Sequence, residues 1–116
     1  MDCVFCSIAE GKIPAPRVLE NDLAFVIRDI PPHAKQHYLV IPKAHTRSLA
    51  EAFTSDEAGR ELLGGLYSLV NELAKSEKLL PDGFRTVINT GENGGQTVHH
   101  LHLHVLGGEK LKGFFG

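Results

Sequence analysis

The stretch that decides the fold reads Val98-His99-His100-Leu101-His102-Leu103-His104-Val105-Leu106. Side chains alternate between the two faces of a β-strand, so the pattern predicts a strand over 98–106. His100, His102 and His104 then share one face, and the aliphatic residues between them enter the core. Histidine titrates closest to neutral pH, so three on one face indicate proton transfer, phosphoryl chemistry or a metal.

Two other interpretations of the three histidines stay open. Neighbours two residues apart on a strand lie about 7 Å apart and can share an ion, but His100 and His104 lie about 13 Å apart. This spacing therefore does not favour a single ion bound by all three side chains. The histidines could also be ordinary exposed residues of a sheet face, and the loop before them counts against that.

This loop carries the glycines Gly91, Gly94 and Gly95, which allow backbone amides to approach an anion closely. Gln96, Thr97 and Asn89 add side-chain donors. A neutral imidazole nitrogen can attack phosphorus, and such donors hold the charge that develops on the phosphoryl oxygens. Beside the histidines, the loop is a candidate phosphate cradle.

The remaining pattern predicts a small α+β domain with an antiparallel sheet. We expect a short helix over 4–10 that stops at Gly11, a hairpin of 17–20 with 23–28, and strands at 37–41 and 84–89. The long helix should begin at a capping box of Thr54 with Glu57. Its apolar positions are Leu62, Leu63, Leu66, Leu69, Val70 and Leu73.

Gly64 and Gly65 lie in the middle of this helix. They are either a tolerated weakness or a place where another backbone approaches closely, such as that of a second subunit. The chain of 116 residues, with 42% hydrophobic residues and a net charge of −2, is expected to be one domain over 1–116. This net charge gives no general attraction to nucleic acid, so we expect no nucleic-acid partner. The lack of a long apolar run or a leader predicts a cytoplasmic protein without a membrane partner.

The His100–Leu106 stretch resembles the His-φ-His-φ-His-φ-φ signature of the histidine triad (HIT) superfamily. The likeness covers nearly the whole chain, and its other matching segments are Phe5…Ile8…Ile13-Pro14, Ala24-Phe25…Asp29-Ile30, Leu39-Val40-Ile41-Pro42-Lys43…His45 and Asn89…Gly95-Gln96-Thr97. Gly107-Gly108 after the triad is similar to the Hint branch of nucleoside phosphoramidases.

The resemblance implies a HIT-like fold: an antiparallel sheet of about five strands, one long helix and a short N-terminal helix, dimerising into one continuous sheet. It implies hydrolysis of purine nucleoside 5′-phosphoramidates to AMP through a nucleotidyl-histidine, with no cofactor required for catalysis. A dinucleoside polyphosphate hydrolase, a nucleotide-binding regulator with incidental hydrolysis, and a pure metal-binding module are the alternatives.

The resemblance also implies residue roles. His102 is the expected nucleophile, His104 a phosphate contact, and His100 the group that sets the tautomer of the nucleophile. The expected contacts to the phosphate and the leaving group are Asn89, Gly95, Gln96 and Thr97. Asp29 is expected to accept the ribose hydroxyls, with Ile30 and Phe5 flanking the base. Asp29 could instead be a turn residue, and Ile30 and Phe5 could be core. We expect His99 to be partly buried and outside the active face.

Cys3 and Cys6 form a C-x-x-C pair, which in a reducing compartment indicates metal or redox chemistry. Some bacterial triad proteins hold zinc on such a pair and two histidines. The resemblance therefore implies a possible structural zinc on Cys3, Cys6, His45 and His100. Two reduced cysteines near the terminus are an equal alternative.

The C-terminal tail, 109–116, is variable in this branch and often crosses to the partner subunit. We expect Phe114 and Phe115 to pack on that partner, near its site.

Overall fold

The protein is built on one antiparallel sheet of five strands in the order β1-β2-β3-β5-β4. The computed structural model describes residues 3–113, so Phe114 and Phe115 and the contact predicted for them lie outside the described residues. The strands are β1 (Leu19–Glu20), β2 (Ala24–Arg28), β3 (Gln36–Pro42), β4 (Phe84–Val87) and β5 (Leu103–Gly107). The helices are α1 (Val4–Ala9), α2 (Leu49–Ala52) and α3 (Asp56–Ser76). The α+β fold, the hairpin and both expected helices are confirmed.

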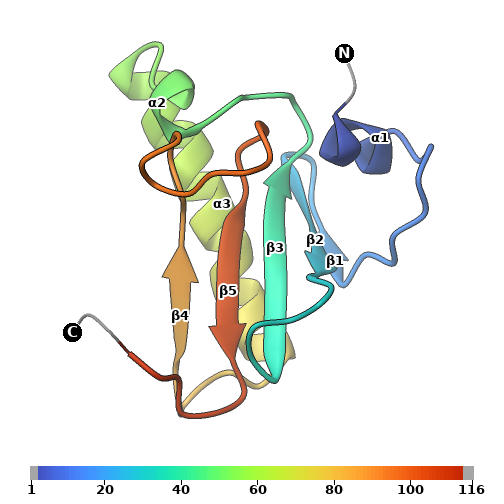
Figure 1. Ribbon diagram of the computed structural model, residues 1–116, viewed down its shortest axis with the longest axis vertical. Coiled ribbons are helices and arrows are strands. Elements are labelled where there is room, and N and C mark those ends of the chain that lie inside the picture. Colours follow the sequence, from blue (N-terminus) through green and yellow to red (C-terminus); the bar gives the residue numbers. More distant parts are fainter. Residues whose placement is uncertain (1–2, 114–116) are drawn as a thin grey trace.

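The central strands are buried on both faces because a helix covers each face. α3 lies along one face, and the short α1 lies near the other, beside the ends of β2 and β3 (Figure 1). Alternate residues of one strand enter different cores: Val26 packs in the α3 cluster and Phe25 in the α1 cluster. On β5, Leu103 and Val105 point toward α3 as expected. His104, between them, is thereby directed to the α1 face.

The long helix begins one residue later than the capping box predicts. Ser55, not Thr54, is its N-cap, and the Ser55 hydroxyl accepts a hydrogen bond from the Ala58 amide at 3.1 Å. Serine and threonine hydroxyls can both cap a helix, so the sequence offers two adjacent candidates. The one-turn α2 was not expected; Ser48 caps it by accepting from the Glu51 amide.

The paired glycines of α3 have different surroundings. A Cβ at Gly65 would lie 2.2 Å from Cδ2 of Leu23, so a side chain of the hairpin, not another backbone, fills that space. A Cβ at Gly64 would meet nothing within 4 Å. The alternative of a close backbone approach is therefore wrong within the protomer, and a subunit contact at Gly64 stays a prediction.

The histidine strand is shorter than predicted, since β5 begins at Leu103. The reason lies in its neighbour β3, which ends at Pro42. The Pro42 carbonyl accepts from Nε2 of His100 at 2.8 Å instead of from a strand amide. The Leu101 amide turns away and donates to the Thr46 carbonyl at 2.7 Å. His100 and His102 thus lie in an extended segment before β5. Likewise β4 stops at Val87, two residues before the expected end. In residues 3–113, no helix is long and apolar enough to cross a membrane.

Candidate functional site

His102 is held in one tautomer by its own segment. Its Nδ1 lies 2.7 Å from the His100 carbonyl oxygen, which can only accept, so Nδ1 carries the proton. Nε2 is therefore the nitrogen with a free lone pair, as a nucleophile requires. The prediction placed this tautomer-setting role on His100, and the structure assigns it to the backbone carbonyl of His100 and not to its side chain.

A second hydrogen-bonded chain ends at His104. The His33 backbone amide donates to Nδ1 of His37 at 3.0 Å, so the proton of neutral His37 is on Nε2. That Nε2 lies 2.9 Å from Nδ1 of His104 and 3.3 Å from Oδ2 of Asp29. His37 therefore donates to His104, and the proton of His104 is left on Nε2. A neutral His104 can then donate to a phosphoryl oxygen.

Burial keeps these imidazoles neutral. Burial, and then the neighbouring His102 and His37, lower the pKa of His104 to about 4. Burial also lowers the pKa of His37, against the opposite effect of Asp29. His37 was missing from the predicted site residues. Its place in a strand, on the same face as Leu39 and Ile41, was the signal that could have revealed it.

Three of the predicted nucleotide contacts differ in their surroundings. The Phe5 ring is buried in the α1 cluster, as the core alternative expects, and packs edge-on against the His102 ring, with centroids 5.1 Å apart. Asp29 is half-buried, its Oδ1 accepts from the Ile30 amide at 2.9 Å, and its Oδ2 lies 3.3 Å from Nε2 of His37. Ile30 is 86% exposed, so the core alternative for this residue is wrong and its side chain is open to a ligand.

The glycine-rich loop is held in shape by Gln96. Its side-chain amide donates to the Arg47 carbonyl at 2.7 Å and to the Val98 carbonyl at 3.0 Å, and its Oε1 accepts from the Gly91 amide. Both amide hydrogens are used, so the side chain braces the loop and has no donor left for a phosphate, contrary to prediction. Asn89 donates to the Gly94 carbonyl.

The other loop positions are open to solvent. Gly95 has φ +79°, a conformation that glycine adopts without strain. Thr97 is exposed, as a contact to a leaving group requires. His99 is exposed too, so the expectation of a partly buried His99 is wrong. Its neighbours Val98 and His100 point into the protein, and alternation leaves His99 outside.

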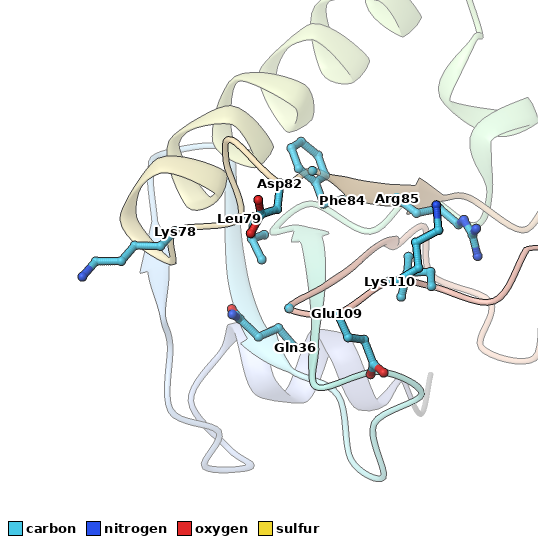
Figure 2. A pocket seen from close by; sticks show the side chains of 11 residues that line it. Gln36, Lys78, Leu79, Asp82, Phe84, Arg85, Glu109 and Lys110 are labelled. Atoms are coloured by element: carbon cyan, nitrogen blue, oxygen red, sulfur yellow. The ribbon is translucent and has the colours of Figure 1, made fainter.

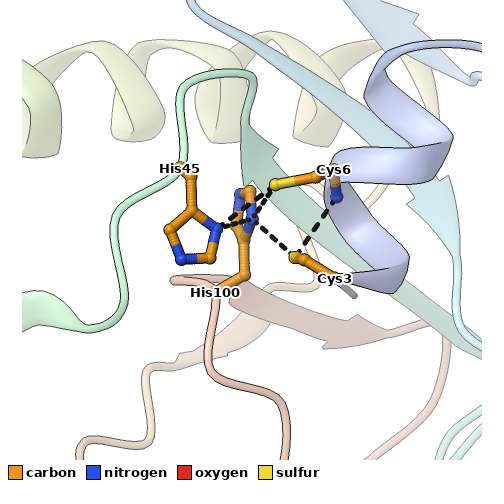
Figure 3. A group of neighbouring side chains, drawn as sticks. All are labelled: Cys3, Cys6, His45 and His100. Atoms are coloured by element: carbon orange, nitrogen blue, oxygen red, sulfur yellow. Dashed lines mark hydrogen bonds between the residues drawn. The ribbon is translucent and has the colours of Figure 1, made fainter. Parts of the chain in front are cut away.

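The four predicted metal ligands lie together. Cys3, Cys6, His45 and His100 place one donor atom each within 4.8 Å of one another, although the sequence separates them widely (Figure 3). Nδ1 of His100 lies 3.3 Å from Sγ of Cys3 and 3.5 Å from Sγ of Cys6. Nδ1 of His45 lies 3.2 Å from both Sγ of Cys6 and Nδ1 of His100.

These residues fit a zinc ion. Tetrahedral zinc sets its nitrogen ligands about 3.3 Å apart and nitrogen from sulfur about 3.6 Å apart, close to the distances above. His100 donates its Nε2 proton to the Pro42 carbonyl, so its Nδ1 lone pair faces the cluster. Nε2 of His45 is buried and has no hydrogen-bond partner among the described residues. When the ring proton of His45 is on Nε2, its Nδ1 lone pair is free to bind an ion.

A bound cation would change the protonation state of the Cys6 thiol. Burial and the adjacent Cys3 raise the pKa of the Cys6 thiol to about 11. Without an ion the thiol stays protonated at neutral pH, and a bound Zn²⁺ would displace the proton. His37 differs, because its Nδ1 accepts the His33 amide and its Nε2 carries the proton. The group of Asp29, His37 and His104 is therefore a hydrogen-bond relay and not a second set of ligands.

A cavity of about 700 Å³ lies at the other end of the sheet (Figure 2). Its charged side chains are mixed in sign, and they are Lys78, Asp82, Arg85, Glu109 and Lys110. Among the described residues that line it there is no predicted catalytic, nucleotide or metal residue, and the tail contributes Glu109, Lys110 and Leu111. This cavity is therefore separate from the predicted site at the histidines.

Fold and site together define a class of protein: a small α+β protein with two neighbouring histidines, one with its Nδ1 proton held by a carbonyl and one with a ring N–H donor, beside a glycine-rich loop. A model of the HIT domain family matches residues 10–111, and the chain belongs to this family. An uncharacterized HIT-like protein of Synechococcus elongatus is 48% identical over 110 residues, 95% of this chain and 93% of that protein.

Three solved structures share the fold over nearly the whole chain. A histidine triad protein from Clostridium difficile has a TM-score of 0.92 and 39% identity, covering 99% of this chain and 97% of that one. A HIT family hydrolase from Legionella pneumophila has a TM-score of 0.88 and 40% identity, covering 96% of each. A Zn-bound histidine triad family protein from Mycobacterium smegmatis has a TM-score of 0.80 and 38% identity, covering 97% and 81%.

Proposed function

We propose that this protein is a hydrolase that cleaves purine nucleoside 5′-phosphoramidates to AMP through a nucleotidyl-histidine on His102. One observation carries the proposal: the His100 carbonyl holds the Nδ1 proton of His102 and leaves Nε2 free. The similarity to a HIT family hydrolase supports hydrolysis in general. The cleavage of a P–N bond and the preference for a purine base are proposed beyond what that similarity supports.

The reaction has two balanced steps. Nε2 of His102 attacks the α-phosphorus, the new N–P bond forms, and the P–N bond to the leaving amine breaks. The amine takes a proton from solvent as it leaves, at the exposed position where Thr97 is the side chain assigned to contact it, and the water of the second step returns a proton to solvent. Nε2–H of His104 and the loop amides stabilise the phosphoryl charge. Water then attacks the phosphorus, His102 is released, and AMP departs.

Adenosine 5′-phosphoramidate is the substrate for the test. The protein should release AMP and ammonia, and acid-free quenching should trap a chain heavier by one adenylyl group at His102. His102→Ala should lose both, while His99→Ala, an exposed neighbour, should keep both. Turnover that survives in His102→Ala would overturn the proposal.

A diadenosine polyphosphate offered in competition tests the bond that is cleaved. The same nucleophile can attack a phosphoanhydride, so only the preference distinguishes the two activities. We expect the phosphoramidate to have the higher kcat/KM. A strong preference for the polyphosphate would assign the protein to that other activity.

We also propose that Cys3, Cys6, His45 and His100 hold a structural zinc, which makes no contact with the reacting atoms. The donor distances and the Zn-bound relative support this. Metal analysis of protein purified without a His-tag should give about one zinc per chain. Cys3→Ser should lose it, and substoichiometric zinc in the unmodified protein would contradict the proposal.

A homodimer through β4 is the third part of the proposal. In the described part of the chain β4 is an edge strand, bonded to β5 alone, and edge strands readily pair with another chain. Beside it, Tyr67 of α3 is 40% exposed and bonds Thr86 of β4, and Gly64 has open space above it. Light scattering should give the mass of a dimer, and Gly64→Glu should give a monomer. A monomeric unmodified protein would refute this arrangement.

A further inference from the structure

One residue belongs to the metal-ligand cluster and also holds the nucleophile. The His100 imidazole is fully buried and faces the two thiols, with Sγ of Cys3 at 3.3 Å. The carbonyl oxygen of the same residue accepts the Nδ1 proton of His102 at 2.7 Å. A movement of the His100 imidazole is coupled to its backbone, and the backbone carbonyl sets which nitrogen of His102 is free.

The helix α1 makes a second connection between the cluster and the nucleophile. Cys3 is its N-cap, Cys6 is in its first turns, and Phe5 lies between them. The Phe5 ring packs edge-on against His102 and His100, with centroids 5.1 and 5.8 Å away. A helix of six residues is not stable alone, so its position depends on its packing and on what its cysteines bind.

We propose that the Cys3–Cys6–His45–His100 cluster controls the tautomer and orientation of the nucleophile according to whether it holds a divalent ion. His100 is then a positioning residue that acts on His102 through its carbonyl. With the ion bound, the segment is fixed and Nε2 of His102 is free. Without it, the segment keeps its bonds to the Pro42 and Thr46 carbonyls but loses the anchor of the His100 ring to the cysteines, and its carbonyl is held less firmly. This inference rests on the proposed role of His102 as nucleophile.

Among residues 3–113, this cluster is the group of potential ligands through which an ion can affect the nucleophile. The other close group of potential ligands, around His37, has its Nε2 occupied by a proton because the His33 amide holds Nδ1. An added ion that acts on the nucleophile must therefore act through the cysteine cluster. This makes the cysteines the residues to change in a test.

The test uses the full, untagged chain with ¹⁵N-labelled histidine, kept either with a chelator or with one equivalent of zinc chloride. NMR of His102 reports its tautomer and the lifetime of its Nδ1 proton. Zinc should give a single Nδ1–H tautomer with a slowly exchanging proton, and its removal should give mixed tautomers. Single-turnover formation of the nucleotidyl-histidine should be faster with zinc on the order of tenfold to a hundredfold, with AMP affinity changed far less.

Two variants separate positioning from simple stabilisation. Cys6→Ser should behave like the metal-free protein even when zinc is present. Val70→Ala, in the other core on α3, should lose stability and yet keep the full response of His102 to zinc. If Val70→Ala reproduces the mixed tautomers of Cys6→Ser, the effect is one of general stability and the inference is overturned.

The outcomes distinguish this inference from the proposed function. Identical His102 spectra with and without zinc, or a failure of zinc to bind, would overturn the coupling even in an active enzyme. A His102 that responds to zinc, in a protein that forms no nucleotidyl-histidine from any phosphoramidate, would overturn the proposed function and leave the positioning role of His100 standing.

Discussion

Acid should destabilise this protein through His104 before the bulk of its carboxylates are protonated. Burial, with His102 and His37 beside it, lowers the pKa of His104 from 6.5 to about 4. As the pH falls, the unfolded chain takes up this proton near its ordinary pKa, and the folded protein takes it up only near pH 4. The contribution of His104 to stability is therefore complete above pH 6.5 and is lost progressively down to pH 4.

The size of the effect follows from one proton. Stability changes by about 1.4 kcal/mol per pH unit when the unfolded state holds one more proton than the folded state. Moving from pH 7 to pH 5 should cost about 2 kcal/mol for this group. Between these values the folded protein keeps His104 neutral, with its Nε2–H available to a phosphate.

Urea unfolding measures the free energy of unfolding at each pH. It is followed by far-UV circular dichroism because the chain has no tryptophan for fluorescence. The unmodified protein and His104→Gln are compared at pH 7, 6 and 5, both with a chelator, so that effects of metal loss cancel. The difference between their free energies of unfolding should shift by about 2 kcal/mol from pH 7 to pH 5. His99→Gln, an exposed control, should follow the unmodified protein. A difference between His104→Gln and the unmodified protein that stays constant over this range would refute the reasoning.

Three further changes test other contacts. His37→Phe removes the donor that fixes the proton of His104 on Nε2, so kcat should fall on the order of a hundredfold; an unchanged kcat in a steady-state assay would contradict the relay. Gly59→Ala should destabilise the protein by about 1–3 kcal/mol in urea unfolding, because a Cβ there would lie 2.2 Å from the Phe53 ring. Adding Phe53→Ala should remove most of this penalty, and a penalty that persists would place the clash elsewhere. Gln96→Glu sets a carboxylate against two backbone carbonyls, so KM should rise and the thermal midpoint should fall by several degrees; a normal KM would mean that the loop keeps its shape without this brace.

Local patterns predicted the elements because each depends on neighbouring residues. The leucine spacing of α3, the stop of α1 at Gly11 and the aliphatic face of β5 all follow from periodicity or backbone preference. The same local view could not find where β5 begins. That boundary depends on Pro42, 58 residues before His100, whose carbonyl is bonded by the His100 ring.

The candidate site, too, could be predicted from the sequence only in part. The resemblance brought together Cys3, Cys6, His45 and His100, and the structure places them within reach of one ion. His37 escaped notice because in the sequence it reads as one end of an apolar strand. Its importance comes from the antiparallel register of β3 with β5, which pairs Leu39 with His104 and sets His37 beside it. Register between distant strands is not visible in either segment alone.

The contact between Cys3 and His100 joins residues 97 positions apart, nearly the two ends of the chain. A covalent cross-link closing a loop of this length would lower the entropy of the unfolded chain by an amount worth about 4.7 kcal/mol. During synthesis α1 is made before all five strands, but its partner His100 is made only after β1 to β4. The helix therefore cannot complete its contacts until His100 has been made, and until then its cysteines lack this partner.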